Sequence, residues 1–470
     1  MSVKHHPVPT HYINQMNKQL LTALLAGGLA ATTVTAHAQA NDALLNKLVS
    51  KGLLTKQEAD ELKTESDAGF DKSYRAKTGL PDWVTALKLS GDVRGRFDGI
   101  YFENDAEGAP NRDRNRLRYR LRFGATATFK DNFELGLRLT SGEAQSSFGG
   151  DPISGNSSFQ DNGSKKFLWI DQAYGRWTPL NNDTWKAGVT LGKMENPFVV
   201  SPLVFDEDYT PEGAALFGSY NPTKEHSLKL TGGFFWLDEI NQGEDANNDA
   251  FLFGGQMRWD AKWTPSLDTS LGAAFFALSD ARTLTNFSVP NLNAGNTRNA
   301  DGTLAEAFRP VVLDAAVTYS LPQVAGYKGK FPLKLHGSYL HNTTASQNNT
   351  GWEAGFTAGK AGKKGTWELG YRYRFLDHDA WYEEFVDSDF GAFYQTTSAN
   401  ANVPSSSSFN GYRAGTNVRG HIFRAAYSPA DAFTFSITYA LAELIDPSVV
   451  AGRETESETG RLHVDAMWKF

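Results

Sequence analysis

The stretch that decides the fold class is residues 115–123, NRLRYRLRF. Its four arginines alternate strictly with apolar residues: Arg116, Arg118, Arg120 and Arg122 against Leu117, Tyr119, Leu121 and Phe123. An extended strand points successive side chains to opposite faces, so all four guanidiniums share one face, whereas a helix would mix the two sets. Because four like charges on one face repel one another, that face needs water, counter-anions or facing carboxylates.

The same alternation of polarity continues to the end of the chain. Segments of about ten residues are separated by turns, with no convincing amphipathic helix between them. We expect about sixteen strands, over residues 85–100, 115–129, 133–144, 167–178, 184–193, 213–220, 226–237, 249–263, 267–279, 309–320, 331–341, 350–360, 365–378, 417–428, 431–443 and 459–470.

The connections between these segments alternate in length. The short ones are 130–132, 179–183, 221–225, 264–266, 361–364 and 429–430, and the long ones are 101–114, 145–166, 194–212, 238–248, 280–308, 379–416 and 444–458. Only 321–330 and 341–349 blur the distinction. Short turns at one end and long loops at the other are typical of an up-and-down transmembrane β-barrel.

The faces of the segments support this prediction. In residues 367–375, aromatic and leucine side chains alternate with glutamate, glycine and arginine, and residues 251–263 repeat the pattern. A soluble β-sandwich also alternates, with its apolar face as the core. So many strands with charge along their polar faces favour an apolar-out, polar-in barrel. We therefore predict an all-β transmembrane protein whose residues 83–470 form an antiparallel up-and-down barrel of about 16 strands.

The N-terminal residues predict export from the cytoplasm. Residues 20–36 are apolar, Lys18 precedes them, and two A-x-A patterns follow at 36–38 and 38–40, so residues 1–40 are expected to be a signal peptide. Met16 is a candidate for the true start, and an uncleaved membrane anchor is the alternative.

A short helical prefix is expected at residues 41–66, in the periplasm, where leucines recur at helical spacing and Thr55 and Glu58 form a capping box. This prefix would pair as a coiled coil, pack on the barrel rim or act as a solvated tether. Residues 67–82 are expected to be a linker.

Composition restricts the chemistry. The 470 residues include no cysteine, which excludes disulfides and thiolate metal sites, and the net charge is −7. We expect no cofactor and no metal site. Whole-chain charge is a poor guide to partners when charge is segregated by face and loop.

Several features in order resemble a known family. They are the signal peptide, the prefix LVSKGLLTKQEADEL, the arginine-rich second strand and the terminal MWKF. The last strand, ending in Phe470, resembles the C-terminal signature of Gram-negative outer-membrane barrels, whose final aromatic residue is read by the barrel assembly machinery. The whole pattern resembles the bacterial putative porin family, related in character to phosphate-selective porins. That resemblance implies an outer-membrane, usually trimeric, water-filled pore for small hydrophilic solutes.

If the apolar face meets lipid, the four alternating arginines of residues 116–122, which we call the arginine ladder, line the lumen. Neighbouring strands add further basic residues, so the expected pore-lining set is Arg94, Arg96, Arg116, Arg118, Arg120, Arg122 and Arg138. Arginine stays charged, and its planar fork matches carboxylate or phosphate oxygens. The alternative is that the ladder only balances acidic lumen residues and holds the wall.

The connection 195–213, ENPFVVSPLVFDEDYTPEG, is a candidate constriction loop. Its acids are Glu195, Asp206, Glu207, Asp208 and Glu212. Acid on this loop opposite arginine on the wall would create a transverse field that sorts solutes by charge. The alternatives are an ordinary external loop or a calcium site at 206–208, although the other ligands of a known calcium loop are missing.

Elsewhere the polar faces carry more basic than acidic residues, which predicts a modest preference for anions. Acidic outer loops such as 239–249 would repel anions or bind divalent ions at the lipopolysaccharide surface. We weight the constriction more heavily, because fields are least screened where a pore is narrowest.

Other classes of protein remain as alternatives. A barrel hydrolase would need a His near a Ser or Asp, yet His336, His421 and His463 fall on different strands and no G-x-S-x-G motif occurs. An adhesin or structural barrel would suit the polar loops 280–308 and 379–416, and would be favoured by a lumen closed by loops. Nucleic acid is not expected, since the ladder's aromatics lie on the face opposite its arginines.

Overall fold

The computed structural model describes residues 81–104, 113–143, 153–238, 249–281, 284, 293–299, 303–395, 410–446 and 457–470. The expected signal peptide, helical prefix and nearly all of the linker lie outside the described residues, as does most of the acidic loop 239–249. Within the described ranges, no helix is both long enough and apolar enough to cross a membrane.

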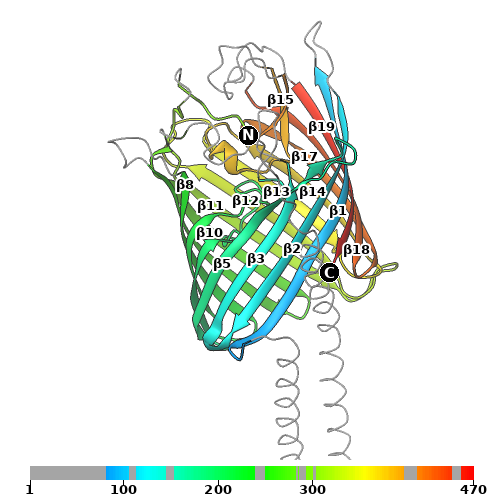
Figure 1. Cartoon of the computed structure of the whole chain (residues 1–470). Coiled ribbons are helices and arrows are strands. Elements are labelled where there is room, and N and C mark those ends of the chain that lie inside the picture. Colours follow the sequence, from blue (N-terminus) through cyan, green and yellow to red (C-terminus); the bar gives the residue numbers. More distant parts are fainter. Residues whose placement is uncertain are drawn as a thin grey trace, which may run out of the picture. The chain divides into compact units, whose positions relative to one another are not determined.

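Sixteen antiparallel strands form a closed β-barrel (Figure 1). In chain order they are β1 (Val84–Asn104), β2 (Arg114–Phe129), β3 (Phe133–Gly142), β5 (Phe167–Asn181), β6 (Trp185–Lys193), β7 (Glu212–Tyr220), β8 (His226–Asp238), β9 (Ala250–Thr264), β10 (Leu267–Leu278), β11 (Pro310–Leu321), β12 (Phe331–Asn342), β13 (Thr350–Gly359), β14 (Thr366–Leu376), β17 (Val418–Ala430), β18 (Phe433–Leu444) and β19 (Ser457–Lys469). Each pairs with its neighbour, and β1 pairs with β19 in a register that runs from Asp92↔Lys469 to Asn104↔Ser457. The predicted fold class is therefore confirmed.

The first residues of β1 belong to a small compact unit of their own. Among the described residues, 81–89 together with Thr126–Lys130 form this unit, and Ser90–Ala125 with the described part of Asp131–Phe470 form the large one. In the small unit, the Lys130 N–H donates to the Trp83 carbonyl at 2.9 Å and the Thr85 hydroxyl donates to the Thr128 carbonyl at 3.0 Å.

Some short elements were not expected from the sequence. β4 (Ser157–Ser158) folds back from the β3–β5 connection and pairs with Arg118 and Tyr119 of β2. The β14–β17 connection contains the hairpin of β15 (Gly391–Gln395) and β16 (Asn410–Ala414) and the 3₁₀ turn η4 (Glu383–Phe385). A second 3₁₀ turn, η1 (Lys130–Asn132), connects β2 to β3. These pieces are too short to show a periodic pattern.

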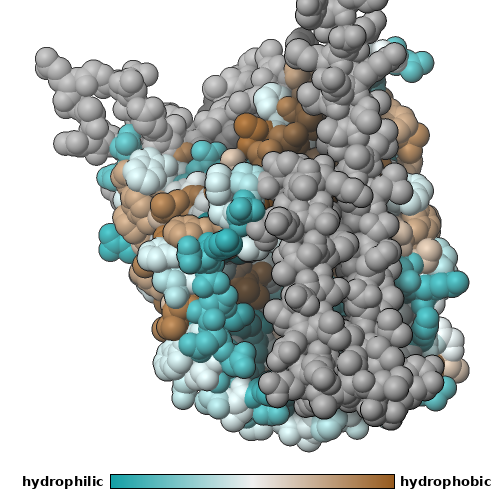
Figure 2. Space-filling view, turned by 60° about the horizontal axis from the view of Figure 1, so that its bottom comes forward, coloured by the Kyte–Doolittle hydropathy of each residue, from teal (hydrophilic) through white to brown (hydrophobic). Residues whose placement is uncertain are grey.

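The strand faces divide as the alternation predicts. On β2, Leu117 is 53% exposed on the outer surface whereas Arg118 and Arg120, which point inward, are 4% and 6% exposed. Exposed aromatic residues also cluster near the short turns, where Phe133 stacks on Trp177 and Trp185 stacks on Tyr220. Figure 2 shows hydrophilic residues gathered toward the end with the short turns and apolar residues on the wall beside them. An apolar outer band with aromatic residues at its border suits a bilayer.

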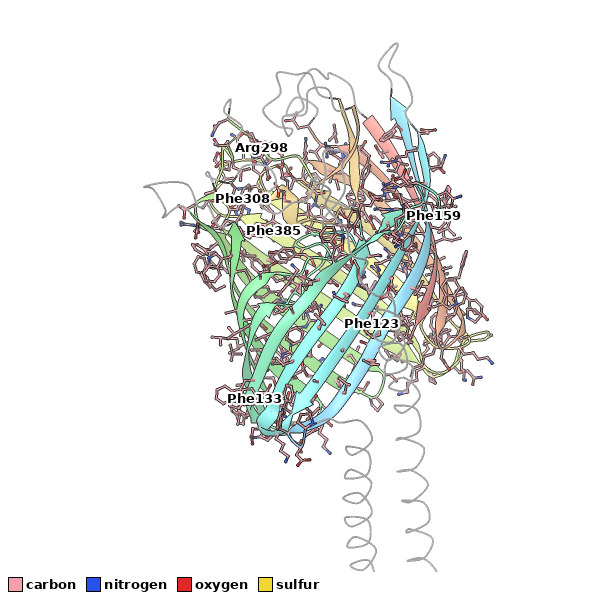
Figure 3. All side chains as sticks on the ribbon, viewed as in Figure 1. Phe123, Phe133, Phe159, Arg298, Phe308 and Phe385 are labelled. Carbon is pink, nitrogen blue, oxygen red and sulfur yellow. The ribbon has the colours of Figure 1, made fainter. Side chains whose placement is uncertain are left out.

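The lumen is not purely polar, because long loops fold into the barrel and bring an apolar core with them. Residues 198–209 of the β6–β7 connection and 380–386 of the β14–β17 connection contribute ten of its 25 buried residues, packed on Phe235 of β8 and Phe276 of β10. Figure 3 shows Arg298, Phe308 and Phe385 gathered at the long-loop end of the barrel. Aromatic side chains on a loop bury a large apolar area when they pack on other apolar groups, so these loops lie against one part of the wall.

Candidate functional site

A charged cavity of about 770 Å³ lies inside the barrel, beside the infolded loops. Its basic lining residues are Arg94, Arg96, Arg120, Arg122, Arg138, Arg372, Arg424, Arg461 and Lys469, all on strands or at the chain end, and its acidic ones are Glu195, Asp206, Glu207, Asp208, Glu368, Asp387, Asp389 and Asp465. Six of the acids come from the two infolded loops. Basic wall and acidic loops thus face the same space, in nearly equal number.

Two ladder arginines hold a wall carboxylate and a loop carboxylate together. Arg120 lies 3.0 Å from Asp92 and 3.2 Å from Asp208, and Arg122 lies 2.7 Å from Asp92 and 3.7 Å from Asp208. Asp92 belongs to the same wall, whereas Asp208 arrives on the β6–β7 loop. The predicted acidic loop therefore reaches the predicted basic wall in the structure.

Arg96 makes the most complete ion pairs of the wall. Its Nε and Nη2 atoms donate to the two oxygens of Asp465 on β19, at 2.7 and 2.9 Å, and its Nη1 atom donates to Asp389 at 3.0 Å. Such a bidentate pair fixes the orientation of the guanidinium and stabilises its charge. Asp389 belongs to the second infolded loop, so this arginine also ties a loop to the wall.

The other predicted arginines divide between wall and cavity. Arg116 and Arg118 lie 2.7 and 3.7 Å from Asp98, which is fully buried and also bonded by Arg461 at 3.2 Å, and neither of the two lines the cavity. Arg138 does line the cavity and is ion-paired with Asp171. For Arg116 and Arg118 the geometry matches the alternative reading, in which the ladder balances acids and holds the wall.

Arg94 is in a different situation. Its Nη2 atom donates to the Asn156 side-chain oxygen at 2.7 Å, and its Nε atom is buried with no hydrogen-bond partner. Asn156 is itself buried and donates to the Ser154 hydroxyl at 2.7 Å. The β3–β5 connection therefore also reaches into the lumen, with neutral polar groups.

The β6–β7 loop is seated on the wall by specific residues of β8 and β9. The Gln256 side chain accepts from the Val199 N–H at 2.9 Å and donates to the Val199 carbonyl at 2.8 Å. Beside it, Phe198 fills space left by Gly233 and Gly254, where an added Cβ would lie 2.9 and 2.4 Å from the ring. The amide and the two glycines together form a seat for residues 198–199.

The two infolded loops are bonded to each other. The Trp381 indole donates to the Val204 carbonyl at 2.8 Å, and the Asp206 N–H donates to the Phe385 carbonyl at 2.7 Å. Asp206 also accepts from the N–H groups of Asp208 and Ser388, each at 2.8 Å. Burial, with added repulsion from Asp208 and Asp387, raises the pKa of Asp206 well above its ordinary value.

The predicted acids of this loop do not act as one set. Glu195, Glu207 and Asp208 line the cavity with accessible side chains, whereas Asp206 is buried in the junction between the loops. Glu212 lies outside the cavity lining and pairs with Lys193 at 3.0 Å. Within the described part of the chain, no group of three or more His, Cys, Asp or Glu residues is placed to hold a metal ion.

The second infolded loop was not predicted from the sequence. Its Asp387 pairs with Arg374 at 2.9 Å, and its Asp389 pairs with Arg96 and Arg461, each at 3.0 Å. The sequence does contain an indication of this loop. Residues 381–390, WYEEFVDSDF, combine aromatic and acidic residues just as 205–209, FDEDY, do. Aromatic residues inside a polar loop indicate a segment that packs on something apolar.

One cluster has residue types found in hydrolases. The Thr297 hydroxyl lies 3.0 Å from His378 Nδ1, and Asp379 Oδ2 lies 2.7 Å from the same nitrogen. A catalytic triad needs its nucleophile and its acid on opposite ring nitrogens, so this arrangement does not activate the hydroxyl. Thr297 also donates to Asp379 directly, at 2.7 Å, which makes the cluster a contact between two loops.

Solved structures similar to this one include the high-pH structure of OprB from Pseudomonas putida, at 11% identity over 86% of this chain and 97% of that chain with a TM-score of 0.47. OmpF from Salmonella typhi, in complex with daunomycin, is 10% identical over 82% and 97% with a TM-score of 0.43. A mutant porin from Rhodopseudomonas blastica is 10% identical over 82% and 100% with a TM-score of 0.39.

The search among curated proteins gave no match. A family model described as putative porin matches residues 108–310, a range that contains the arginine ladder and the whole β6–β7 loop. Over these residues, which are fewer than half of the chain, the sequence is similar to the putative porin family.

Proposed function

We propose that this protein forms a water-filled channel across the outer membrane of a Gram-negative bacterium. Small hydrophilic solutes would pass through it by diffusion, without chemistry. An arginine-lined lumen would favour anions over cations. The cavity would form the narrow part of the path, where solutes lose most of their water and meet fixed charge.

The observation that carries the proposal is that the strand wall and the infolded loops supply opposite charges to one cavity. Arg94 and Arg122 line it from the wall, and Glu195 and Glu207 line it from the β6–β7 loop. Opposed fixed charges at a constriction create a transverse field that acts on polar and charged solutes. The field is least screened by salt where the space is narrowest.

The preference for anions would be modest. Basic and acidic residues line the cavity in nearly equal number, and most of the arginines already have carboxylate partners. Selectivity would therefore arise from the few charges that are not paired within the wall. The preference for anions would be weaker than in a lumen lined by unpaired arginines.

An adhesin or structural barrel is the second candidate, and one observation favours it. The infolded loops fill part of the lumen with a buried apolar core that includes Leu203, Val204, Trp381 and Tyr382. A barrel whose lumen is closed by loops would not conduct solutes, which would suit an adhesin or a structural protein. The charged cavity beside this core favours the channel instead.

Three partner assignments complete the proposal. The protein would be a homotrimer, its acidic outer loops would meet lipopolysaccharide, and Phe470 would be read by the barrel assembly machinery. Phe470 supports the last assignment, because it is 64% exposed on the outer wall at the seam between β19 and β1.

Reversal potentials in planar bilayers test the function. Purified, folded protein should give stepwise conductance, and in a potassium chloride gradient the reversal potential should shift toward the chloride equilibrium value. Folded protein that gives no conductance steps would support the adhesin or structural barrel. A reversal potential at the potassium value would contradict the anion preference alone.

A further inference from the structure

Among the described residues, Arg94 is the one cavity-lining arginine with no carboxylate within ion-pair distance. The other seven all have one within 4 Å: Arg96, Arg120, Arg122, Arg138, Arg372, Arg424 and Arg461. Its neighbour on the same strand face, Arg96, has two. The Arg94 guanidinium therefore presents an unbalanced charge to the cavity.

Buried polar residues hold the Arg94 guanidinium in a fixed position. Asn156 accepts its Nη2 hydrogen bond at 2.7 Å and is itself fixed by the Ser154 hydroxyl at 2.7 Å. Both residues line the cavity and both are more than nine-tenths buried. A neutral amide holds the guanidinium in position without neutralising it, and leaves its Nε atom unpartnered.

The neighbouring arginines show how an anion is held on this wall. Gly155, between Ser154 and Asn156, lies against Arg120, since an added Cβ would be 3.0 Å from the Arg120 Cδ atom. The same short segment therefore contacts both Arg94 and Arg120. On Arg120, the carboxylate of Asp208 already lies in an ion pair of 3.2 Å, delivered by the loop.

We propose that Arg94, Asn156 and Arg120 form a binding site for small oxyanions, and that Asp208 competes with a bound oxyanion for Arg120. A guanidinium fork matches the oxygens of a carboxylate or a phosphate, and an amide supplies a further donor or acceptor. The Asp208 carboxylate sits on an infolded loop and therefore acts as a tethered ligand for one half of the site. This inference rests on the proposed channel, because it makes the site a stopping point for permeating anions.

Channel block tests the site. We would titrate sodium succinate and sodium phosphate separately onto wild-type channels in potassium chloride at constant ionic strength, and record the concentration that halves the current. The Arg94→Gln variant should raise that concentration about tenfold, as expected for the loss of a charged hydrogen bond. Arg94→Lys, which keeps the charge but loses the fork, should raise it by less.

The tethered carboxylate gives a test in the opposite direction. Asp208→Asn removes the loop carboxylate from Arg120 and leaves Asp92 as its wall partner, so it should lower the half-blocking concentration several-fold. Arg419→Gln is the matched control, because Arg419 is a strand arginine paired with Glu443 that does not line the cavity, and block should be unchanged. The salt that blocks at the lower concentration identifies whether carboxylate or phosphate is preferred.

Calorimetric titration of the same two salts into folded protein in detergent separates the two proposals. The binding constants should rank Asp208→Asn above wild type and wild type above Arg94→Gln, whether or not the protein conducts. No binding to wild type, equal binding to wild type and Arg94→Gln, or weaker binding to Asp208→Asn would each overturn the site. Absence of conductance with this ranking intact would overturn the channel and leave the site standing.

Discussion

At the scale of single residues, Gln256 decides where the β6–β7 loop lies. Its amide makes two hydrogen bonds to the Val199 backbone, and it projects from β9 into the lumen. Replacing Gln256 with leucine removes both hydrogen bonds to the part-buried Val199 backbone, at a cost of about 0.5–1.5 kcal/mol each. Limited proteolysis of the folded protein should then cut residues 194–211 faster.

The Gln256→Glu variant refines this prediction. It keeps the acceptor for the Val199 N–H but loses the donor to the Val199 carbonyl, so its effect should lie between wild type and Gln256→Leu. Equal cleavage of all three proteins would show that the loop is held by its apolar packing alone.

Two adjacent glycines on β9 offer a matched pair. Gly254 faces the lumen, where an added Cβ would lie 2.4 Å from the Phe198 ring, whereas Gly255 faces outward with nothing within 4 Å. Gly254→Val should push Phe198 off its seat and lower single-channel conductance, because a loop that no longer lies flat on the wall extends further into the lumen. Gly255→Val should leave conductance unchanged. Equal conductance of the two variants would contradict the seat.

At the scale of elements, the junction of the two infolded loops should respond to pH through Asp206. Burial, followed by Asp208 and Asp387, raises the pKa of this carboxyl in the folded protein. A raised native pKa means that the native state binds more protons, so the stabilising contribution is present at low pH and is lost as pH rises from about 4 through the raised value. The junction should be tighter at pH 4 than at pH 7.

Proteolysis of residues 194–211 measured across that pH window checks this expectation. Cleavage should be slower at the acidic end in wild type, with a protease active across the window. Asp206→Asn cannot titrate, so its cleavage rate should depend much less on pH, even if the lost acceptor makes the junction weaker overall. The same pH dependence in both proteins would assign the effect to another group.

The strands could be predicted from the sequence and the infolded loops could not, for a physical reason. A strand such as β14 shows its two faces within eleven residues, because the pattern has a period of two. The position of Val204 instead depends on Trp381, Phe385 and Gln256, which come from other loops and strands. The acids at 206–208 marked the loop as chemically unusual, but nothing local showed that Asp206 would be buried while Asp208 reaches Arg120.

At the scale of the whole molecule, barrel closure decides which charges meet. Arg96 and Asp465 are separated by 369 positions in the chain and become paired only because β1 joins β19. The same closure brings Arg461 onto Asp98. Since these pairs cross the seam, the local sequence could not predict which arginines have carboxylate partners, and Arg94 could not be singled out.

The seam between β19 and β1 is closed by a contact between Phe470 and Gly91. Phe470 exchanges two backbone hydrogen bonds of 3.1 Å with Gly91, and its ring lies over that glycine, where an added Cβ would be 2.5 Å from the ring and 2.4 Å from the Arg122 carbonyl. Gly91→Val should therefore push the last strand off β1 and lower the temperature at which the unboiled barrel loses its compact mobility on a denaturing gel. Gly95→Val is the control, four residues along the same strand with nothing within 4 Å. Phe470→Ala should cause a smaller loss than Gly91→Val, since the ring is exposed to the lipid face and its removal strains nothing. If Gly91→Val and Gly95→Val unfold at the same temperature, the seam does not depend on this glycine.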